Sequence, residues 1–516
     1  MPRYRTTDVE SGQGLFLTVN LQDQLLPGTY EHMLNEIIGK EIDLSIFDSK
    51  YKNEHTGASA VPPCVLLKLI MYAYSKGCKS SRKISELNQN NIVAKALTGD
   101  MNIHWTTIAD FISGNREEFA DVFVKVLMYC NELELIGGET EAVDGLRLPS
   151  NASIEMSGTK EELEERLERC RKAAKKHLDR HEKNDALGEV EEEEKKRFEE
   201  RQKQLSKRIE NISNFLNKME PKQGKNGKEI KSNVTDNDSA MIHSSKGIIQ
   251  GYIGQAVTDS RNQIIVGCQA VGSSNEGEHL QALLDKTAKD LKEAGVGRVK
   301  EAEGVKEAGE ASEEKKKSLL ADANYFSEDN LRACDERGIE AIIPDGQHKR
   351  RLNAEGQKRF EVPDFNYNEE GNYYECPNGK KLEYKSTKEN NGDEEKVYQA
   401  STKDCKACPL FSKCSWSKKE QGTIKQGKTL KITKTNKPGN LGHKMREKLS
   451  TDEYQALYSR RIQIVEPVFS NIGYCKWLNR FMLRGSDKVN GQWTLYCIVH
   501  NLGKCVNWYN GNRKSA

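Results

Sequence analysis

Apolar positions recur at helical spacing through the first quarter of the chain. After an extended run at 14–21, this spacing predicts helices at 30–42, 65–77, 80–90 and 91–99, and one long helix at 106–130. Short helices joined by tight turns, with Arg82 and Lys83 at the start of one of them, are typical of a helix-turn-helix DNA reader. They are equally typical of a plain helical bundle, so both interpretations stay open.

A highly charged segment at residues 159–219 carries a sparse apolar repeat. Its members step by three and four residues, as in a heptad seam: Leu163, Leu167, Cys170 and Ala174, then Leu205, Ile209, Ile212, Leu216 and Met219. The NDALG stretch at 184–188 predicts a turn between two helices. We therefore expect a charged antiparallel helical hairpin inserted as an arm, with a dimerising coiled coil as the alternative.

Strand and helix patterns alternate in the remaining sequence up to residue 346. Strands are expected at 142–144, 247–257, 263–271, 318–322 and 339–346, helices at 277–295 and 327–338, and a solvated linker at 297–317. This order predicts an α/β fold, in which a mixed sheet has crossover helices and a large helical insertion follows the first strand.

The length, charge and composition of the chain limit the classes of protein to which it can belong. A chain of 516 residues exceeds one ordinary core, and its 80 basic and 78 acidic residues lie in blocks, so the net charge of +2 does not argue against a nucleic-acid partner. The N-terminus lacks the apolar core of a signal peptide, and the longest apolar run, 61–74, is interrupted by Lys68. We expect a cytoplasmic protein with no membrane segment.

Two aspartates end equivalent strands. Asp144 closes the strand at 142–144 and Asp322 closes the run at 318–322, so parallel pairing of these strands would bring both carboxylates to one sheet edge. Two neighbouring anions need a cation between them, and Mg²⁺ or Mn²⁺ suits oxygen ligands. Glu466, on a helix expected from 452 to 472, is the candidate third ligand. Taken singly, each aspartate fits a cap or turn residue as well.

Three stretches resemble the acidic motifs of bacterial insertion-sequence transposases with a DDE, RNase H-like catalytic domain. They are AVDGLRLPSNAS from 142, LLADANYFSEDNL from 319 and VEPVFSNIGYCKWLNRFMLRG from 465; the helical segment at 56–87 is similar to the N-terminal domain of that group. The resemblance spans residues 50 to 508. It implies strand cleavage and strand transfer with two Mg²⁺ or Mn²⁺ ions held by Asp144, Asp322 and Glu466.

The resemblance also implies partners and DNA contacts. The partners would be the element's terminal inverted repeats and target DNA, bound by a homodimer when two ends are synapsed, in a bacterial cytoplasm at the nucleoid. The group carries a Tyr, Arg, Glu, Lys series that Tyr458, Arg461 and Glu466 match, whereas Gly473 stands where the lysine is expected. Either Lys476 takes over the contact to DNA phosphate, or this element end is handled differently. A degraded, inactive copy is a further alternative, and the intact acids argue against it. Further DNA contacts are expected from Arg480 and Arg484, and from Arg82 and Lys83.

Four cysteines are clustered between the second aspartate and the glutamate. Cys405 and Cys408 have the spacing of a zinc knuckle, and with Cys376 and Cys414 they would complete a closed Cys₄ site. Unliganded reduced thiols are the alternative. The stretch 421–446 has no acid and suits DNA phosphate contacts or a solvated loop.

Near the C-terminus, several polar and aromatic residues are expected to pack in the core. His500 and Asn501 fit packing residues better than ligands, and core burial is expected for Trp477 and Trp493, with stacking on unpaired bases as the alternative.

The domains expected are an N-terminal helical DNA-binding domain at 1–135, a first catalytic strand at 136–158, the helical hairpin at 159–232, the rest of the RNase H-like domain at 233–346, a basic cysteine-rich zinc insertion at 347–445 and catalytic helices at 446–516. The leading hypothesis is a metal-dependent DNA transposase. A non-catalytic DNA-binding regulator is the runner-up, and a stand-alone nuclease would leave the helical domain and basic insertion unexplained.

Overall fold

In the computed structural model the residues described are 20–51, 59–185, 192–224, 227–244, 247–296, 316–349, 360–390, 393–414, 421–433 and 439–513. Most of the extended run expected at 14–21 and most of the linker expected at 297–317 lie outside them, as does the end of the turn expected at 184–188.

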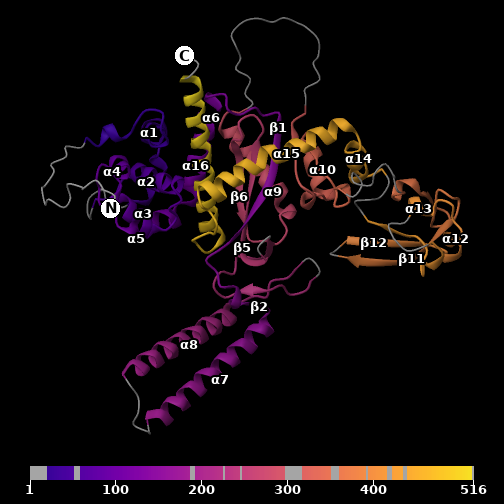
Figure 1. The fold of residues 1–516 in the computed structure, drawn as a ribbon, viewed down its shortest axis with the longest axis horizontal. Coiled ribbons are helices and arrows are strands. Elements are labelled where there is room, and N and C mark those ends of the chain that lie inside the picture. Colours follow the sequence, from indigo (N-terminus) through magenta and orange to yellow (C-terminus); the bar gives the residue numbers. More distant parts are fainter. Residues whose placement is uncertain are drawn as a thin grey trace, which may run out of the picture.

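The N-terminal region is helical (Figure 1). Its α-helices are α1 (Tyr30–Glu36), α2 (Pro63–Ser75), α3 (Ser81–Asn90), α4 (Ile92–Thr98), α5 (Trp105–Gly114) and α6 (Arg116–Glu132). The single long helix expected at 106–130 is wrong, because the chain breaks at Asn115. Its backbone leaves the helical region (φ −122°, ψ 46°), and its side-chain amide donates to the Phe111 carbonyl at 2.7 Å. Asparagine favours such a local side-chain bond over a continued helix.

A six-stranded mixed sheet forms the centre of the molecule. Its strands run in the order β4 (Ala240–Ser244), β5 (Gly247–Asp259), β1 (Thr140–Pro149), β7 (Ser318–Leu320) and β8 (Glu340–Ile342), and β6 (Ile265–Val271) also pairs with β5. β1 is antiparallel to β5 and parallel to β7, and β7 is parallel to β8. The expected mixed α/β sheet is confirmed, with β4 as a strand that the sequence pattern did not indicate.

Four helices accompany this sheet: α9 (Leu280–Glu293), α10 (Glu328–Glu336), α15 (Asp452–Ser470) and α16 (Ser486–Arg513). The C-terminal helix α16 packs against β6 on one side and α6 on the other. Trp493 of α16 lies on the sheet, where its indole N–H donates to the Gln255 carbonyl at 2.9 Å, and Gly254 leaves room for the ring.

The N-terminal helices and the sheet share one hydrophobic core. Tyr74 of α2 stacks on Tyr496 of α16 with ring centroids 4.4 Å apart, and both side chains are buried. The buried thiols of Cys130 and Cys505 lie 3.6 Å apart between α6 and α16. Because α16 contacts both parts, the helical region packs directly against the sheet.

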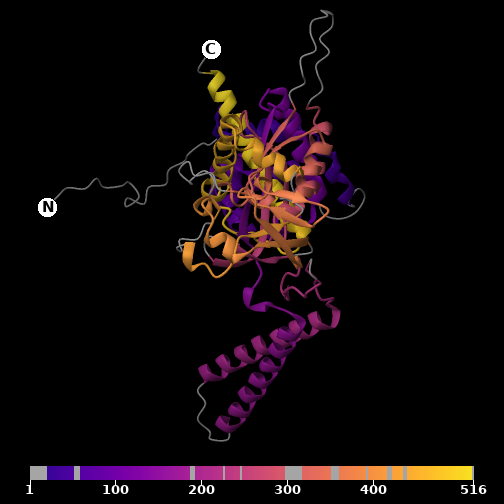
Figure 2. The same ribbon diagram turned by 90° about the vertical axis from the view of Figure 1, so that its right-hand side faces the viewer.

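A two-helix arm extends away from this body, as two perpendicular views show (Figures 1 and 2). It is formed by α7 (Lys160–Asp185) and α8 (Glu192–Lys218), with the short pair β2 (Ser157–Gly158) and β3 (Ser232–Asn233) at its base. Ile212 and Leu167 of the predicted seam are buried in a small cluster with Met156. The helical hairpin expected after the first strand is therefore present.

Between β8 and α15 the chain forms a second sheet with a core of its own. Its antiparallel strands are β9 (Asn366–Asn368), β10 (Tyr373–Glu375), β11 (Lys381–Asn390), β12 (Asp393–Ala400) and β13 (Thr429–Ile432), with short helices α12 (Thr402–Lys406) and α13 (Phe411–Cys414), and α14 (Leu441–Lys448) leads back to the body. The sequence predicted a cysteine-rich insertion here but no sheet. Within the described ranges, no helix combines the length and the apolar character that a membrane span needs.

Candidate active site

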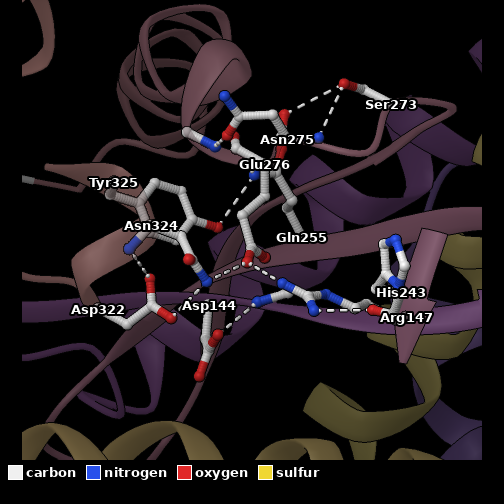
Figure 3. A network of polar contacts seen from close by, with 12 residues as sticks. Asp144, Arg147, His243, Gln255, Ser273, Asn275, Glu276, Asp322, Asn324 and Tyr325 are labelled. Atoms are coloured by element: carbon white, nitrogen blue, oxygen red, sulfur yellow. Dashed lines mark hydrogen bonds and ion pairs between the residues drawn. The ribbon is translucent and has the colours of Figure 1, made fainter. Parts of the chain in front are cut away.

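Asp144 and Asp322 come from adjacent parallel strands. Ala142 of β1 pairs in register with Leu320 of β7, and each aspartate follows two residues later along its chain. The strand end expected at Asp144 is wrong, because β1 continues beside β5 to Pro149. Since β7 ends at Leu320, both carboxylates still lie past its carboxyl end, and a close view shows them near one another (Figure 3).

Asp322 is held by the turn that follows its strand. Its Oδ1 accepts a hydrogen bond from the Asn324 backbone N–H at 2.9 Å, and its Oδ2 accepts one from the Asn324 side-chain amide at 2.9 Å. Burial raises the pKa of Asp322, and the neighbouring charge of Asp144 raises it further. Two anions thus share this edge, and each disfavours the charge of the other.

Arg461 of α15 neutralises Asp144. Its Nη1 donates to Oδ2 of Asp144 at 2.8 Å, and the side chains are only 14% and 24% exposed. Tyr458 lies one turn earlier on the same helix, and burial raises the pKa of its phenol, beside Arg461 and both aspartates. Two residues of the expected Tyr, Arg, Glu series therefore lie at the acidic edge.

Glu466 is on α15 but is exposed, and in the described part of the chain it makes no hydrogen bond or ion pair with either aspartate. At about 100° per residue it lies roughly 140° around the helix from Arg461. The helix remains intact at Pro467, which cannot donate to the Gln463 carbonyl; the Gln263 side chain supplies that bond at 2.8 Å. A π-helical turn, Asn471–Cys475, follows at once.

The structure brings three further residues to this edge that the sequence reasoning missed. Glu276 precedes α9, and its Oε1 accepts from the Arg147 guanidinium at 2.9 Å and from the Asn324 amide at 3.0 Å (Figure 3). Arg147 and Asn324 lie inside two of the quoted motifs. Glu276 lies in a polar loop whose sequence pattern does not indicate burial. Its burial is the one feature that would have identified it as a candidate site residue.

The residues expected to contact DNA lie in several places. Arg480 and Arg484 donate to the carbonyls of Ser150 and Asn151 at 3.0 and 2.6 Å, which anchors their loop on the end of β1. Lys476 is 8% exposed and contacts the Asn471 amide oxygen; burial lowers its pKa to about 8.

The start of α3 is close to the same loop. The guanidinium of Arg82 stacks over Trp105, with 4.8 Å to the ring centroid. Lys79 donates to the Trp477 carbonyl at 3.1 Å, and burial lowers its pKa, as do the charges of Arg480 and Lys83. Cations from the N-terminal helices and from the loop after α15 therefore form one basic surface.

Core burial was expected for Trp477 and Trp493, and it holds only for Trp493. Trp477 is 63% exposed with a left-handed backbone (φ 53°), because its ring lies against Gly77, where a Cβ would come within 2.9 Å of it. His500 and Asn501 are buried as expected. Asn501 bonds both backbone groups of Ile265 at 2.9 Å, and burial lowers the pKa of His500 to about 3.

The four clustered cysteines lie around the core of the second sheet. The backbone N–H groups of Lys380 and Lys428 donate to the sulfurs of Cys376 and Cys405 at 3.4 and 3.3 Å. Burial raises the pKa of Cys414, and the other three thiols raise it further. Among the residues described, no group of three or more His, Cys, Asp or Glu side chains has the arrangement of a metal site, so neither the zinc nor the catalytic ions are shown.

Comparison with protein families gives two matches. Residues 20–114 match the Transposase domain (DUF772), and residues 375–506 match the Transposase DDE domain. The chain carries the domains of a DDE-type insertion-sequence transposase. No curated protein and no solved structure matches significantly. The DDE match includes Glu466 and the clustered cysteines, whereas Asp144, Glu276 and Asp322 lie outside both matched regions. A transposase processes DNA, and the mixed α/β sheet is compatible with the RNase H-like fold that the DDE domain implies.

Proposed function

We propose that this transposase cleaves DNA at the ends of an insertion sequence and joins those ends to a target, with Asp144, Asp322 and Glu466 as its catalytic acids. The observation that carries the proposal is the register of β1 and β7, which brings two aspartates to one sheet edge. Burial raises the pKa of Asp322, and the neighbouring charge of Asp144 raises it further, as this proximity requires.

The donor set suits a hard divalent cation. The acids present only oxygen ligands, and one buried carboxylate oxygen of Glu276 has no hydrogen-bond partner in the described structure. Two Mg²⁺ or Mn²⁺ ions bound there would stabilise negative charge on the attacking and leaving oxygens of a phosphodiester. The acids would hold the ions, and Arg461 would move from Asp144 to a DNA phosphate.

The reaction balances without another reactant. Hydrolysis breaks the P–O3′ bond and forms a P–O bond to the water oxygen. One water proton goes to the leaving 3′-oxygen, and the other is released to solvent from the new 5′-phosphate. In strand transfer that 3′-oxygen forms a new bond to a target phosphorus, and the target's own 3′-oxygen leaves with a proton. The oxidation state of phosphorus does not change in either step, so no oxidant or reductant is needed.

The rest of the chain would bind and position DNA. The basic surface formed by Arg82, Lys83 and Arg480 suits backbone phosphates, and Arg484 and Lys476 belong to the same loop. We assign a structural zinc to Cys376, Cys405, Cys408 and Cys414, since three of these thiols pack against the core of the second sheet and two of the sulfurs accept backbone N–H hydrogen bonds. Terminal inverted repeats and target DNA are the proposed ligands, and a homodimer would hold two ends together.

The test is cleavage of labelled DNA carrying the element's ends, in Mn²⁺, by the wild type and by Asp144→Asn. Asp335→Asn, which changes an exposed aspartate of α10, is the matched control. The proposal expects nicking by the wild type and the control and none by Asp144→Asn. Tight DNA binding without nicking by any of them would instead identify a regulator, a reading that the exposed Glu466 and the Arg461–Asp144 ion pair favour.

A further inference from the structure

Glu276 is the most deeply buried acid at the catalytic edge. It is 2% exposed, and its loop is fixed from several sides. The Glu276 carbonyl accepts from the buried Gln255 amide at 2.9 Å, and the Gly277 carbonyl accepts from the Asn330 amide at 2.9 Å. A carboxylate this well fixed has its position determined by the fold, and little freedom to turn toward water.

One oxygen of this carboxylate is satisfied and the other is not. Oε1 accepts from Arg147 and Asn324, whereas Oε2 is buried and has no hydrogen-bond partner among the described residues. A buried carboxylate oxygen without a partner is unfavourable, and a bound cation would supply that partner. Gly145, the residue after Asp144, leaves the space, since a Cβ there would overlap with Oε2.

The acidic side chains around Glu276 also outnumber the basic ones. Three carboxylates, Asp144, Glu276 and Asp322, face two guanidiniums, Arg147 and Arg461, which leaves a formal excess of one negative charge. Burial raises the pKa of Glu276, and the charge of Asp322 raises it further. Asn324 bridges Asp322 and Glu276, so the two acids are held by one side chain.

We infer that Glu276 is an additional carboxylate of the cation site, sharing a divalent metal ion with Asp144 and Asp322 through its unpaired Oε2. The inference rests on the proposed function for the identity of the site, but it concerns cation binding, which is measured without DNA. Once Arg461 has left Asp144, as proposed above, the three carboxylates and Arg147 carry two excess negative charges, and one divalent cation would balance them while it pairs the free oxygen. Glu276 would then be needed for cation affinity as much as the two aspartates are.

The test is Mn²⁺ binding by the full-length protein, followed by isothermal titration with the metal alone. Glu276→Gln keeps an oxygen that accepts from Arg147 and Asn324 but removes the charge and the free carboxylate oxygen. Glu278→Gln is the matched control, because Glu278 lies in the same turn, is exposed, and accepts a bond from Asn275 at 3.0 Å. A purely structural role for Glu276 predicts equal Mn²⁺ affinity in all three proteins.

We expect Glu276→Gln to weaken Mn²⁺ binding about tenfold or more, with Glu278→Gln unchanged. Mn²⁺ should also raise the melting temperature of the wild type more than that of Glu276→Gln. If Glu276→Gln does not fold, Glu276→Asp is the second variant, because it keeps the charge on a shorter side chain. We expect it to bind Mn²⁺ more weakly than the wild type but more tightly than a protein without this carboxylate. Wild-type Mn²⁺ affinity in Glu276→Asp would count against the inference.

The outcomes separate this inference from the proposed function. If Asp144→Asn and Asp322→Asn lose Mn²⁺ binding while Glu276→Gln keeps it, Glu276 is not a ligand and the proposed function stands. If Glu276→Gln loses Mn²⁺ binding but wild-type protein never nicks DNA, the cation site stands and the proposed function falls. A wild type that binds no Mn²⁺ overturns the inference.

Discussion

Replacing Arg461 with Gln tests whether its ion pair with Asp144 holds α15 against the sheet. The pair joins α15 to β1 at 2.8 Å, with side chains 14% and 24% exposed. A fully exposed pair contributes about 0–1 kcal/mol, and removing one partner of a fully buried pair costs about 3–5 kcal/mol. This pair lies between those limits, so we expect a loss of about 2 kcal/mol, or a melting temperature lower by roughly 2 °C for a chain of 516 residues.

The assay is thermal unfolding without added metal, in a double-mutant cycle with Asp144→Asn. Arg460→Gln, which changes the exposed neighbouring arginine, is the control and should melt like the wild type. We expect the double variant to be more stable than the sum of the two single losses, with a coupling of about 1–3 kcal/mol. Strict additivity would show that the pair contributes nothing and would refute the reasoning. The same Arg461→Gln variant should bind Mn²⁺ more tightly, because Asp144 is then free of its internal cation.

Three further predictions concern the regions around the site. Protein purified under reducing conditions should contain about one zinc per chain by elemental analysis, lost in Cys405→Ser and kept in Cys170→Ser; metal-free wild type would contradict the Cys₄ assignment. Trp477→Ala should weaken binding to DNA with unpaired ends by about 1–3 kcal/mol, with duplex binding and melting temperature unchanged; equal losses on both DNAs would exclude stacking. The pKa of Lys476 falls from 10.5 to about 8 on folding, so the unfolded chain binds more protons than the folded one between these pH values. The wild type should therefore gain stability relative to Lys476→Met as pH rises from 7 to 10. Melting temperatures that change with pH in parallel for the two proteins would contradict this.

The meeting of Asp144 and Asp322 was predictable because two rules act together, although β1 runs on past Asp144 to Pro149. Apolar runs of strand length ended on Asp144 and Asp322, and parallel strands present their carboxyl ends at one edge. The helical arm was equally predictable from the sequence, since its apolar residues recur at three- and four-residue steps, which is the period of a helix. In both cases the residues that fit the local secondary structure are also the residues that the tertiary packing requires.

Other features depend on contacts that no local pattern encodes. Glu276 lies in a polar loop, and its burial comes from packing against Gly145 on a strand more than a hundred residues earlier. Trp477 has the composition of a core residue, but a left-handed backbone directs it onto Gly77 at the surface. The second sheet was missed because its strands are rich in Lys, Glu and Asn, with only one apolar face around Leu382 and Tyr398.

The claim that the distant acids share one cation is tested most directly by iron-mediated cleavage of the polypeptide. Fe²⁺ would replace Mg²⁺ in the full-length protein bound to labelled end DNA, and ascorbate with peroxide would cut the backbone beside the ion. The account predicts cuts near Asp144, Asp322 and Glu466, all suppressed by excess Mg²⁺. Cuts that spare either strand end or α15, or that Mg²⁺ does not suppress, would contradict it.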